Sequence, residues 1–342
     1  MKSIALGTGK DGKPGAVLKE IEAPEPARGE IVVDMRACGL CGTDIEKMRG
    51  EYTASMPILG HEAVGVISEV GDGVTGFSKG ERVFPHHHVP CYECYHCRAG
   101  DETMCDMYRK SNIHPGGFSE KFRVPEWNIE KGGVLKLPNE MTFDAGTLIE
   151  PVACCLRAVR KHAKSGETVL VVGAGPVGLM NALLLEPMEV KVLISDVIPS
   201  RLEFASRLNV GTVLDASKGD VRGSVLSETQ GRGADLAIVA SGSGAAILQG
   251  LGAIRKGGRT CLFGVPPKGS VLGYDLATLY NSGQEMVTSY GASDVDTKGA
   301  IGILGANPEF LRLVTHRIPL ERFDEAVEAV SDGTAVKVAI TP

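Results

Sequence analysis

The chain has 342 residues, of which 43% are hydrophobic and 23% charged, and its formal net charge is -6 at pH 7. This length predicts two domains, and the mixture of acidic and basic residues excludes a strongly charged surface for nucleic acid or a membrane. The nine cysteines are odd in number and no signal peptide is expected, so we predict reduced cytoplasmic thiols that can bind metal rather than a disulfide framework.

The predicted elements change in character along the chain. Up to about residue 150, short β-prone runs such as 30–37 and 62–70 alternate with glycine and proline, which predicts an irregular, mostly β domain. Helix-like and strand-like segments then alternate, which predicts a doubly wound parallel sheet. Near 290 a helix and a terminal strand follow, and we expect them to rejoin the first domain. The predicted divisions are therefore 1–150, 151–290 and 291–342.

A first group of possible metal ligands lies near the amino terminus, in the glycine-rich runs CGLCGTD and GHEAVG: Cys41, His61 and Glu62. Three such ligands leave one coordination position open, as in a catalytic zinc site. Each residue also has an ordinary alternative, namely a core thiol, a turn imidazole and a surface carboxylate.

Four cysteines follow within fifteen residues: Cys91, Cys94, Cys97 and Cys105. Zinc accepts four thiolates tetrahedrally, and such a closed site would stabilise a lobe at about 86–110 without binding substrate. An iron–sulfur cluster is the alternative, but its cysteine runs have three residues before the last cysteine and proline after it, whereas here seven residues intervene and Asp106 follows. Nearby histidines are expected to be surface or core side chains rather than ligands: His86, His87, His88 and His96.

An apolar, β-branched run at 168–172 ends in a G-x-G-x-x-G turn. The turn and the start of the next helix contain Gly173, Gly175, Pro176, Val177 and Gly178. We expect Gly173 to permit the tight turn, Gly175 to let the backbone approach a pyrophosphate, and Gly178 to let helix and strand pack closely. A plain strand and loop is the alternative. A membrane span is disfavoured because the apolar run is short and interrupted.

A second strand-like run ends in Asp196, eighteen positions beyond Gly178. An acidic residue at about this distance binds a ribose 2'-hydroxyl and repels a 2'-phosphate, so NAD is favoured over NADP. Arg201 follows in a predicted helix. It is a candidate cofactor contact that could weaken this preference, although a solvated charge is its ordinary interpretation.

Together, the motifs C-G-T-D at 41–44, G-H-E-x-x-G at 60–65, the four cysteines, E-P at 150–151 and G-x-G-x-x-G at 173–178 resemble the zinc-dependent medium-chain dehydrogenase/reductase family. The resemblance covers essentially the whole chain. It implies an α/β protein with a mostly β, GroES-like catalytic domain and a Rossmann domain, and an active site in the cleft between them.

The resemblance also implies roles for individual residues. Cys41 and His61 match ligands of a catalytic zinc, and Glu62 matches a carboxylate that binds the metal directly or lies just behind its ligands. Glu150 lies where alcohol dehydrogenases have a ligand cysteine and the polyol and threonine dehydrogenases have an acid, which groups this chain with the latter. Which glutamate is the third ligand stays open.

Thr43 matches a hydroxyl that accepts the substrate's proton; a turn hydroxyl that caps the following helix is its alternative. Many relatives have a histidine three residues later, whereas this chain has Glu46, so the relay could use Glu46, cofactor hydroxyls or water. Cys154 and Cys155 could line the pocket, but we interpret them as buried helix thiols.

We therefore predict a dehydrogenase with two zinc ions per chain that transfers a hydride between NAD and the CH–OH group of an alcohol, polyol, sugar or hydroxy amino acid. One alternative is an NAD(P)H-dependent aldehyde or semialdehyde reductase. Another is a non-catalytic nucleotide-binding module. The resemblance further implies a homotetramer or homodimer, and the mixed charge distribution predicts no nucleic-acid or membrane partner.

Overall fold

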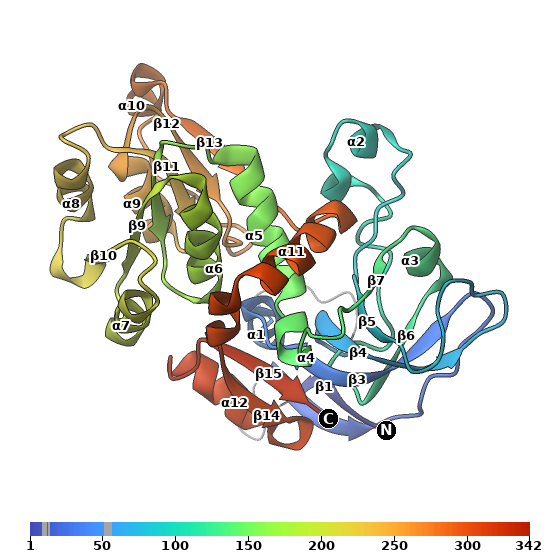
Figure 1. Ribbon diagram of the computed structural model, residues 1–342. Coiled ribbons are helices and arrows are strands. Elements are labelled where there is room, and N and C mark those ends of the chain that lie inside the picture. The colour runs from blue at the N-terminus through green and yellow to red at the C-terminus, as the bar shows by residue number, and fades with distance from the viewer. Residues whose placement is uncertain (9–11, 13, 51–56) are drawn as a thin grey trace. The chain divides into compact units, whose positions relative to one another are not determined.

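The computed structural model describes residues 1–8, 12, 14–50 and 57–342 (Figure 1). The chain folds into two compact units: unit 1 contains Met1–Ala153 and Gly291–Pro342, and unit 2 contains Cys154–Tyr290. The first division falls within helix α5 (Ile149–His162). None of the helices described is long and apolar enough to cross a membrane.

Unit 1 is built on a seven-stranded sheet in which β14, β15, β3, β4, β5 and β7 are neighbours in that order and β6 also pairs with β3. The strands are β3 (Ile31–Gly39), β4 (Glu62–Val70), β5 (Arg82–Pro85), β6 (Lys121–Val124), β7 (Val134–Lys136), β14 (Val314–Pro319) and β15 (Lys337–Thr341). A separate antiparallel pair contains β1 (Lys2–Thr8) and β2 (Pro14–Glu20). Because β15 pairs with β3, the end of the chain completes a sheet that its first third begins.

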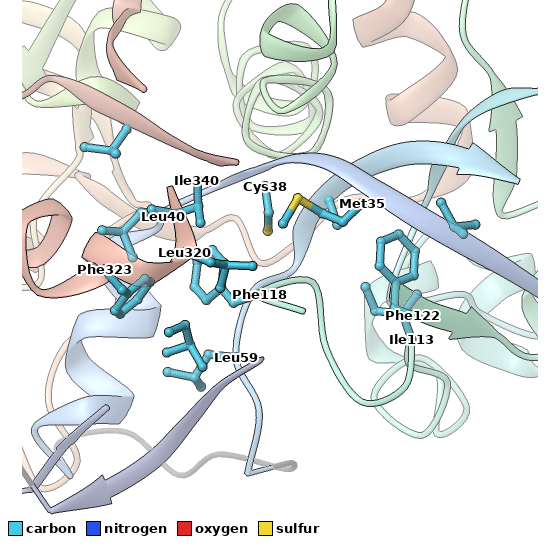
Figure 2. Packing of buried hydrophobic residues seen from close by; sticks show 14 of the residues in the cluster. Met35, Cys38, Leu40, Leu59, Ile113, Phe118, Phe122, Leu320, Phe323 and Ile340 are labelled. Carbon is cyan, nitrogen blue, oxygen red and sulfur yellow. The ribbon is translucent and has the colours of Figure 1, made fainter. Parts of the chain in front are cut away.

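The core of unit 1 joins residues that are far apart in the sequence. Figure 2 shows Leu40, Phe118, Leu320, Phe323 and Ile340 packed together, and all five are buried. The rings of Phe118 and Phe323 meet edge to face, with centroids 5.1 Å apart. Burial of each such side chain contributes about 1.5–3 kcal/mol, so this core holds the carboxyl-terminal segment against the first strands.

The helices of unit 1 are mostly short: α1 (Gly42–Met48), α2 (Tyr95–Arg98), α3 (Glu126–Glu130), α4 (Phe143–Gly146), α11 (Asp294–Ala306) and α12 (Phe323–Ser331). Helix α12 packs on β14 and β15. Helix α11 begins with a capping box, in which the Ser293 hydroxyl and backbone N–H both donate to Asp296 at 2.9 Å. The cap fixes the point at which the chain continues into unit 1 after Gly291.

Unit 2 is a parallel sheet with the strand order β10-β9-β8-β11-β12-β13. Its strands are β8 (Thr168–Val172), β9 (Lys191–Asp196), β10 (Thr212–Asp215), β11 (Ala234–Val239), β12 (Ile254–Leu262) and β13 (Glu285–Thr288), and its helices are α6 (Pro176–Leu185), α7 (Pro199–Leu208), α8 (Val221–Glu228), α9 (Gly244–Ala253) and α10 (Leu276–Ser282). Helices α6 and α7 contact β8, β9 and β10, whereas α9 contacts β8, β11 and β12. The predicted doubly wound fold is confirmed. The strand order reverses beside β8, where such folds bind ligands.

Candidate active site

The first group of candidate ligands gathers at one end of the unit 1 sheet. Cys41 follows β3 and precedes α1, while His61 and Glu62 stand at the start of β4, where Glu62 pairs with Gly39 of β3. One ligand atom each of Cys41, His61 and Glu62 lies within 4.8 Å of the others. An ion bound at about 2.0–2.3 Å from each ligand atom fits such a spacing.

Asp44 supports this group from the first turn of α1. Its carboxylate is fully buried, accepts the backbone N–H of Cys41 at 3.2 Å, and lies 3.3 Å from Nδ1 of His61. Burial works against protonation of His61, but Asp44 outweighs it and raises the pKa of the imidazole well above its ordinary value. A carboxylate behind an imidazole is a common way to orient a metal ligand.

Lys337 at the start of β15 belongs to the site, although sequence reasoning did not identify it. Its Nζ lies 2.6 Å from Oε1 and 2.5 Å from Oε2 of Glu62, and both side chains are buried. Burial lowers the pKa of Lys337, but attraction to Glu62 and Cys41 raises it overall, which favours the ammonium form beside the Glu62 carboxyl group. The signal in the sequence was a single charge in the otherwise apolar strand KVAIT.

Glu150 lies close to the group of three but outside it. It stands at the start of α5 and is 9% exposed, and it does not belong to the set of atoms within 4.8 Å. Its charge nevertheless helps to raise the pKa of Glu62, after the larger effect of burial. The structure therefore brings Cys41, His61 and Glu62 together and leaves Glu150 just beyond them.

Helix α1 places Thr43 and Glu46 on consecutive turns. Cys41 is the N-cap, since its carbonyl accepts the N–H of Asp44 at 3.0 Å and the helix begins at Gly42. The alternative interpretation of Thr43 as the cap is wrong, because Thr43 already lies within the first turn. Both Thr43 and Glu46 are partly buried.

The second group of candidate ligands is equally compact. The sulfur atoms of Cys91, Cys94, Cys97 and Cys105 lie within 4.8 Å of one another. The backbone N–H groups of Glu93 and Cys94 donate to the sulfur of Cys91 at 3.4 and 3.3 Å, and these donors lower the pKa of that thiol to about 6. All nine cysteines of the chain are free thiols. The donor set fits a tetrahedral zinc ion.

The neighbouring histidines occupy different positions. His86 is fully buried and its Nδ1 lies 3.0 Å from Asp294, whereas His96 is exposed. His87 is buried between two other rings, with its centroid 4.0 Å from that of His88 and 5.1 Å from that of His61. Burial lowers the pKa of His87 well below its usual range and that of His88 to about 3, so both rings are uncharged at neutral pH.

A small pocket of about 40 Å³ opens beside these rings. Its lining includes Lys47, Leu59, His61, His87, His88 and Asn112. The pocket therefore shares His61 with the candidate metal site. A substrate bound to that metal would have this pocket at its side.

The glycine turn of unit 2 has the geometry that its sequence predicts. Gly173 has a φ of +104°, which only glycine adopts easily. A Cβ atom at Gly178 would lie 1.8 Å from the carbonyl oxygen of Gly173, whereas at Gly175 it would meet nothing nearer than Arg201 at 3.9 Å. Helix α6 then begins at Pro176. The fold itself explains Gly173 and Gly178, but it does not require glycine at 175.

Asp196 ends β9 beside this turn. Its Oδ2 accepts the N–H of Ala174 at 2.7 Å, and its Oδ1 accepts the N–H groups of Val197 and Ile198 at 2.7 and 2.9 Å. Arg201 is partly exposed, and its guanidinium lies 3.6 Å from Oδ2. Asp196 therefore holds the glycine turn in place in addition to any contact with a ribose.

Cys154 and Cys155 both lie in α5. The sulfur of Cys155 accepts a hydrogen bond from the Asn181 amide at 3.3 Å and lies 3.7 Å from the Val177 carbonyl, so Cys155 packs against α6 within unit 2. This placement agrees with the interpretation of Cys155 as a buried helix thiol, whereas Cys154 is only partly buried.

Two known families match the chain. Residues 27–139 match "Alcohol dehydrogenase GroES-like domain", a stretch that contains both groups of candidate ligands. Residues 176–304 match "Zinc-binding dehydrogenase", starting from the first residue of α6. The two matches thus cover most of unit 1's first segment and most of unit 2.

Individual relatives agree with these matches. The L-threonine 3-dehydrogenase of Mesorhizobium japonicum is 29% identical over 345 residues, which cover 96% of each chain. Alcohol dehydrogenase TADH from Thermus sp. ATN1 has a TM-score of 0.86 at 27% identity, and the match covers 100% of this chain and 99% of the other. A structure from Sinorhizobium meliloti 1021, described as a zinc-binding dehydrogenase bound to NADP, has a TM-score of 0.85 at 26% identity with the same coverage. The chain belongs to the zinc-dependent medium-chain dehydrogenase/reductase family and is a zinc-dependent dehydrogenase of hydroxyl groups that uses a nicotinamide cofactor.

Proposed function

We propose that this chain transfers a hydride between NAD and the CH–OH carbon of a small secondary alcohol, and that Cys41, His61 and Glu62 hold its catalytic zinc. The observation that supports this proposal is the convergence of a thiol, an imidazole and a carboxylate within 4.8 Å, beside a pocket. Zinc bound there would lower the pKa of a coordinated alcohol and favour its alkoxide.

Lys337 changes the charge balance around that site. Without it, a thiolate and two glutamates would outweigh a divalent ion and weaken the site's attraction for an alkoxide. The buried Lys337 ammonium offsets the charge of Glu62, so both Glu62 and Glu150 can stand near the ion without making the site negative. We propose that Lys337 keeps Glu62 ionised and in place as the third ligand, and that Glu150 is a second carboxylate that can approach the ion.

Thr43 is proposed to accept the proton of the substrate hydroxyl. Side chains three residues apart in a helix are neighbours on its surface, so Glu46 is placed to receive a proton from Thr43. This route would replace the histidine that many relatives have. The polyol- and threonine-dehydrogenase branch is favoured because Glu150 is an acid.

NAD is the proposed cofactor, bound at the turn formed by Gly173, Gly175 and Gly178 and the start of α6, including Pro176 and Val177. Asp196 supports NAD over NADP because its carboxylate would repel a 2'-phosphate. The relative from Sinorhizobium meliloti binds NADP, and the partly exposed Arg201 lies next to Asp196. Replacement Asp196→Ala should relax the preference for NAD; an unchanged ratio of the two cofactors' kcat/KM values would contradict the assignment.

A homodimer or homotetramer is also proposed. Exposed apolar side chains gather in sequence around the edge strand β13, including Val271 at 92% and Tyr280 at 86% exposure. An uncovered edge strand with apolar neighbours is suited to pairing with a second copy. The free thiols support a cytoplasmic location.

The experiment that tests the function is a panel of secondary alcohols, polyols and semialdehydes, each assayed with both nicotinamide cofactors by the absorbance of the reduced form. Oxidation of secondary alcohols with NAD is the expected result. Turnover of semialdehydes alone would favour the reductase alternative. Cofactor binding without turnover of any compound would favour the non-catalytic module, which has no need of an open metal site.

A further inference from the structure

The pocket beside His61 has a polar composition that bears on the substrate, provided that the proposed dehydrogenase function holds. Its volume of about 40 Å³ accommodates only a few atoms, on the order of three waters. Such a space suits one small functional group next to the reacting carbon. It is too small for a sugar ring or a long chain.

Lys47 supplies the charge of this pocket. It stands in the last turn of α1, four residues after Thr43, so the two side chains share one face of the helix. Lys47 is partly buried, and its ammonium group forms no hydrogen bond or ion pair within the described parts of the chain. Burial is the main cause of the lowered pKa values of His87 and His88, and the charge of Lys47 adds to it. The ammonium group therefore lies close to both rings.

The other polar groups of the pocket have part of their hydrogen-bonding capacity unused. The side-chain oxygen of Asn112 accepts the N–H of Ile113 at 2.9 Å, which leaves its amide N–H groups as donors. His88 Nδ1 lies 3.2 Å from the carbonyl of Ser111 and must donate to it, which leaves Nε2 as an acceptor. In addition, Nδ1 of His87 is buried without a partner in the described structure.

The pocket contains no acid that could neutralise Lys47, as far as the described lining residues go. The nearest buried carboxylates already have partners, because Asp44 accepts the N–H of Cys41 and Glu62 is paired with Lys337. Among its described lining residues the pocket therefore offers one positive charge, no negative charge and a neutral amide donor, while burial opposes ionisation of the neighbouring Asp44 and the charge of Lys47 helps to lower the pKa of that carboxyl group. This combination recognises an anion, and a neutral polyol would leave the ammonium without a partner.

We infer that this pocket binds the carboxylate of the substrate, and that the substrate is a small hydroxy acid or hydroxy amino acid whose carboxylate accepts hydrogen bonds from Lys47 and Asn112. Because the pocket shares His61 with the candidate metal site, this carboxylate would lie beside a hydroxyl group bound at that site. The acceptor nitrogen of His88 can receive a hydroxyl or amino hydrogen of the same molecule.

The test uses two pairs of compounds that differ in the charge of one group: 3-hydroxybutanoate and its methyl ester, and L-threonine and its methyl ester. For the zinc-loaded protein with NAD, kcat/KM for at least one acid should exceed that of its ester roughly 10- to 100-fold, the effect of one or two charge-assisted hydrogen bonds. Lys47→Met should remove this preference, mainly by raising KM for the acid, and should leave the ester within about 2-fold.

Lys79→Met is the matched control, because Lys79 is an exposed lysine of the same unit. This variant should change kcat/KM for neither the acid nor the ester. The inference is overturned if the wild-type protein oxidises esters as well as acids, or if Lys47→Met slows both equally; in either case the dehydrogenase function stands. If no alcohol is oxidised, the proposed function fails, and calorimetric binding of 3-hydroxybutanoate still decides the inference. Loss of that binding in Lys47→Met supports the carboxylate site, and equal binding by both proteins overturns it.

Discussion

Unit 1 buries three charged side chains, Asp44, Glu62 and Lys337, at one group of candidate ligands, whereas the centre of unit 2 is an apolar parallel sheet whose charged pairs stand at its ends. In unit 1 these charges surround candidate ligands and must be held in place before a substrate arrives. In unit 2 the candidate cofactor site is shaped by backbone, through the turn between Gly173 and Gly178. The difference indicates that the candidate metal site of unit 1 depends on charged side chains held in fixed positions. The candidate cofactor site of unit 2 depends instead on a backbone that a ligand can approach closely.

The largest effect on stability should come from breaking the buried pair. Lys337→Met leaves Glu62 as an uncompensated buried charge, so the free energy of unfolding in urea should fall by about 3–5 kcal/mol. The partly exposed pair between Lys121 and Asp34, with a 2.6 Å contact, provides the control. Lys121→Met should cost less than about 1 kcal/mol.

The double variant Lys337→Met with Glu62→Gln should recover much of the lost stability, because no buried charge then remains unpaired. If Lys337→Met lowers the free energy of unfolding no more than Lys121→Met does, the buried charges of unit 1 have no special effect on stability, and the contrast with unit 2 fails.

The glycine turn provides the corresponding test in unit 2. Gly175→Ala meets no protein atom closer than 3.9 Å, so it should leave Tm unchanged while weakening NAD binding roughly 10- to 100-fold through the loss of backbone contacts to the pyrophosphate. Gly178→Ala is the contrasting variant, since its Cβ would clash with Gly173 and lower stability as well. Unchanged NAD affinity in Gly175→Ala, measured by calorimetry, would contradict the assigned role of the turn.

A smaller, pH-dependent effect is expected at the amino-terminal end of β11 in unit 2. Asp235 accepts hydrogen bonds from Arg255, Arg232 and the Thr168 N–H; burial opposes ionisation, but these donors lower the pKa of Asp235 to about 2. Because the folded pKa is below the unfolded one, the carboxylate stabilises the protein above about pH 4, and this stabilisation is lost as pH falls towards 2.

Asp235→Asn should therefore lower the free energy of unfolding by about 1–2 kcal/mol at pH 7, and the difference from wild type should shrink towards zero in acid. Urea titrations across this pH range measure it. A difference that stays constant or grows as pH falls would contradict the assignment.

Local patterns made much of unit 2 predictable. Strands buried on both faces appear as continuous apolar runs, such as the fully buried β8, and the alternation with helices identified the parallel sheet. The conformations of Gly173 and Gly178 follow from contacts within a few residues of each other. The four-cysteine group was predictable for the same reason, because its members lie within fifteen residues.

The less predictable features depend on contacts between distant segments. Lys337 and Glu62 are 275 positions apart and meet because β15 pairs with β3 beside β4. The sequence did not indicate that Lys47 would stand beside His87 and His88, since the three meet through tertiary packing. The alternative role of Thr43 as a helix cap was wrong because α1 begins at Gly42, before Thr43. Sequence propensity alone defines such helix boundaries poorly.

The central claim is that the metal which activates substrate belongs to Cys41, His61 and Glu62 in unit 1, separately from the cofactor site in unit 2. The direct test is zinc content per chain for the wild-type protein and Cys41→Ser, together with turnover and NAD binding of the same samples. We expect two zinc ions in wild type, one for each ligand group, and one in Cys41→Ser, with turnover reduced roughly 1,000-fold and NAD affinity within about 2-fold. Two retained zinc ions with full turnover, or simultaneous loss of NAD binding, would contradict the claim.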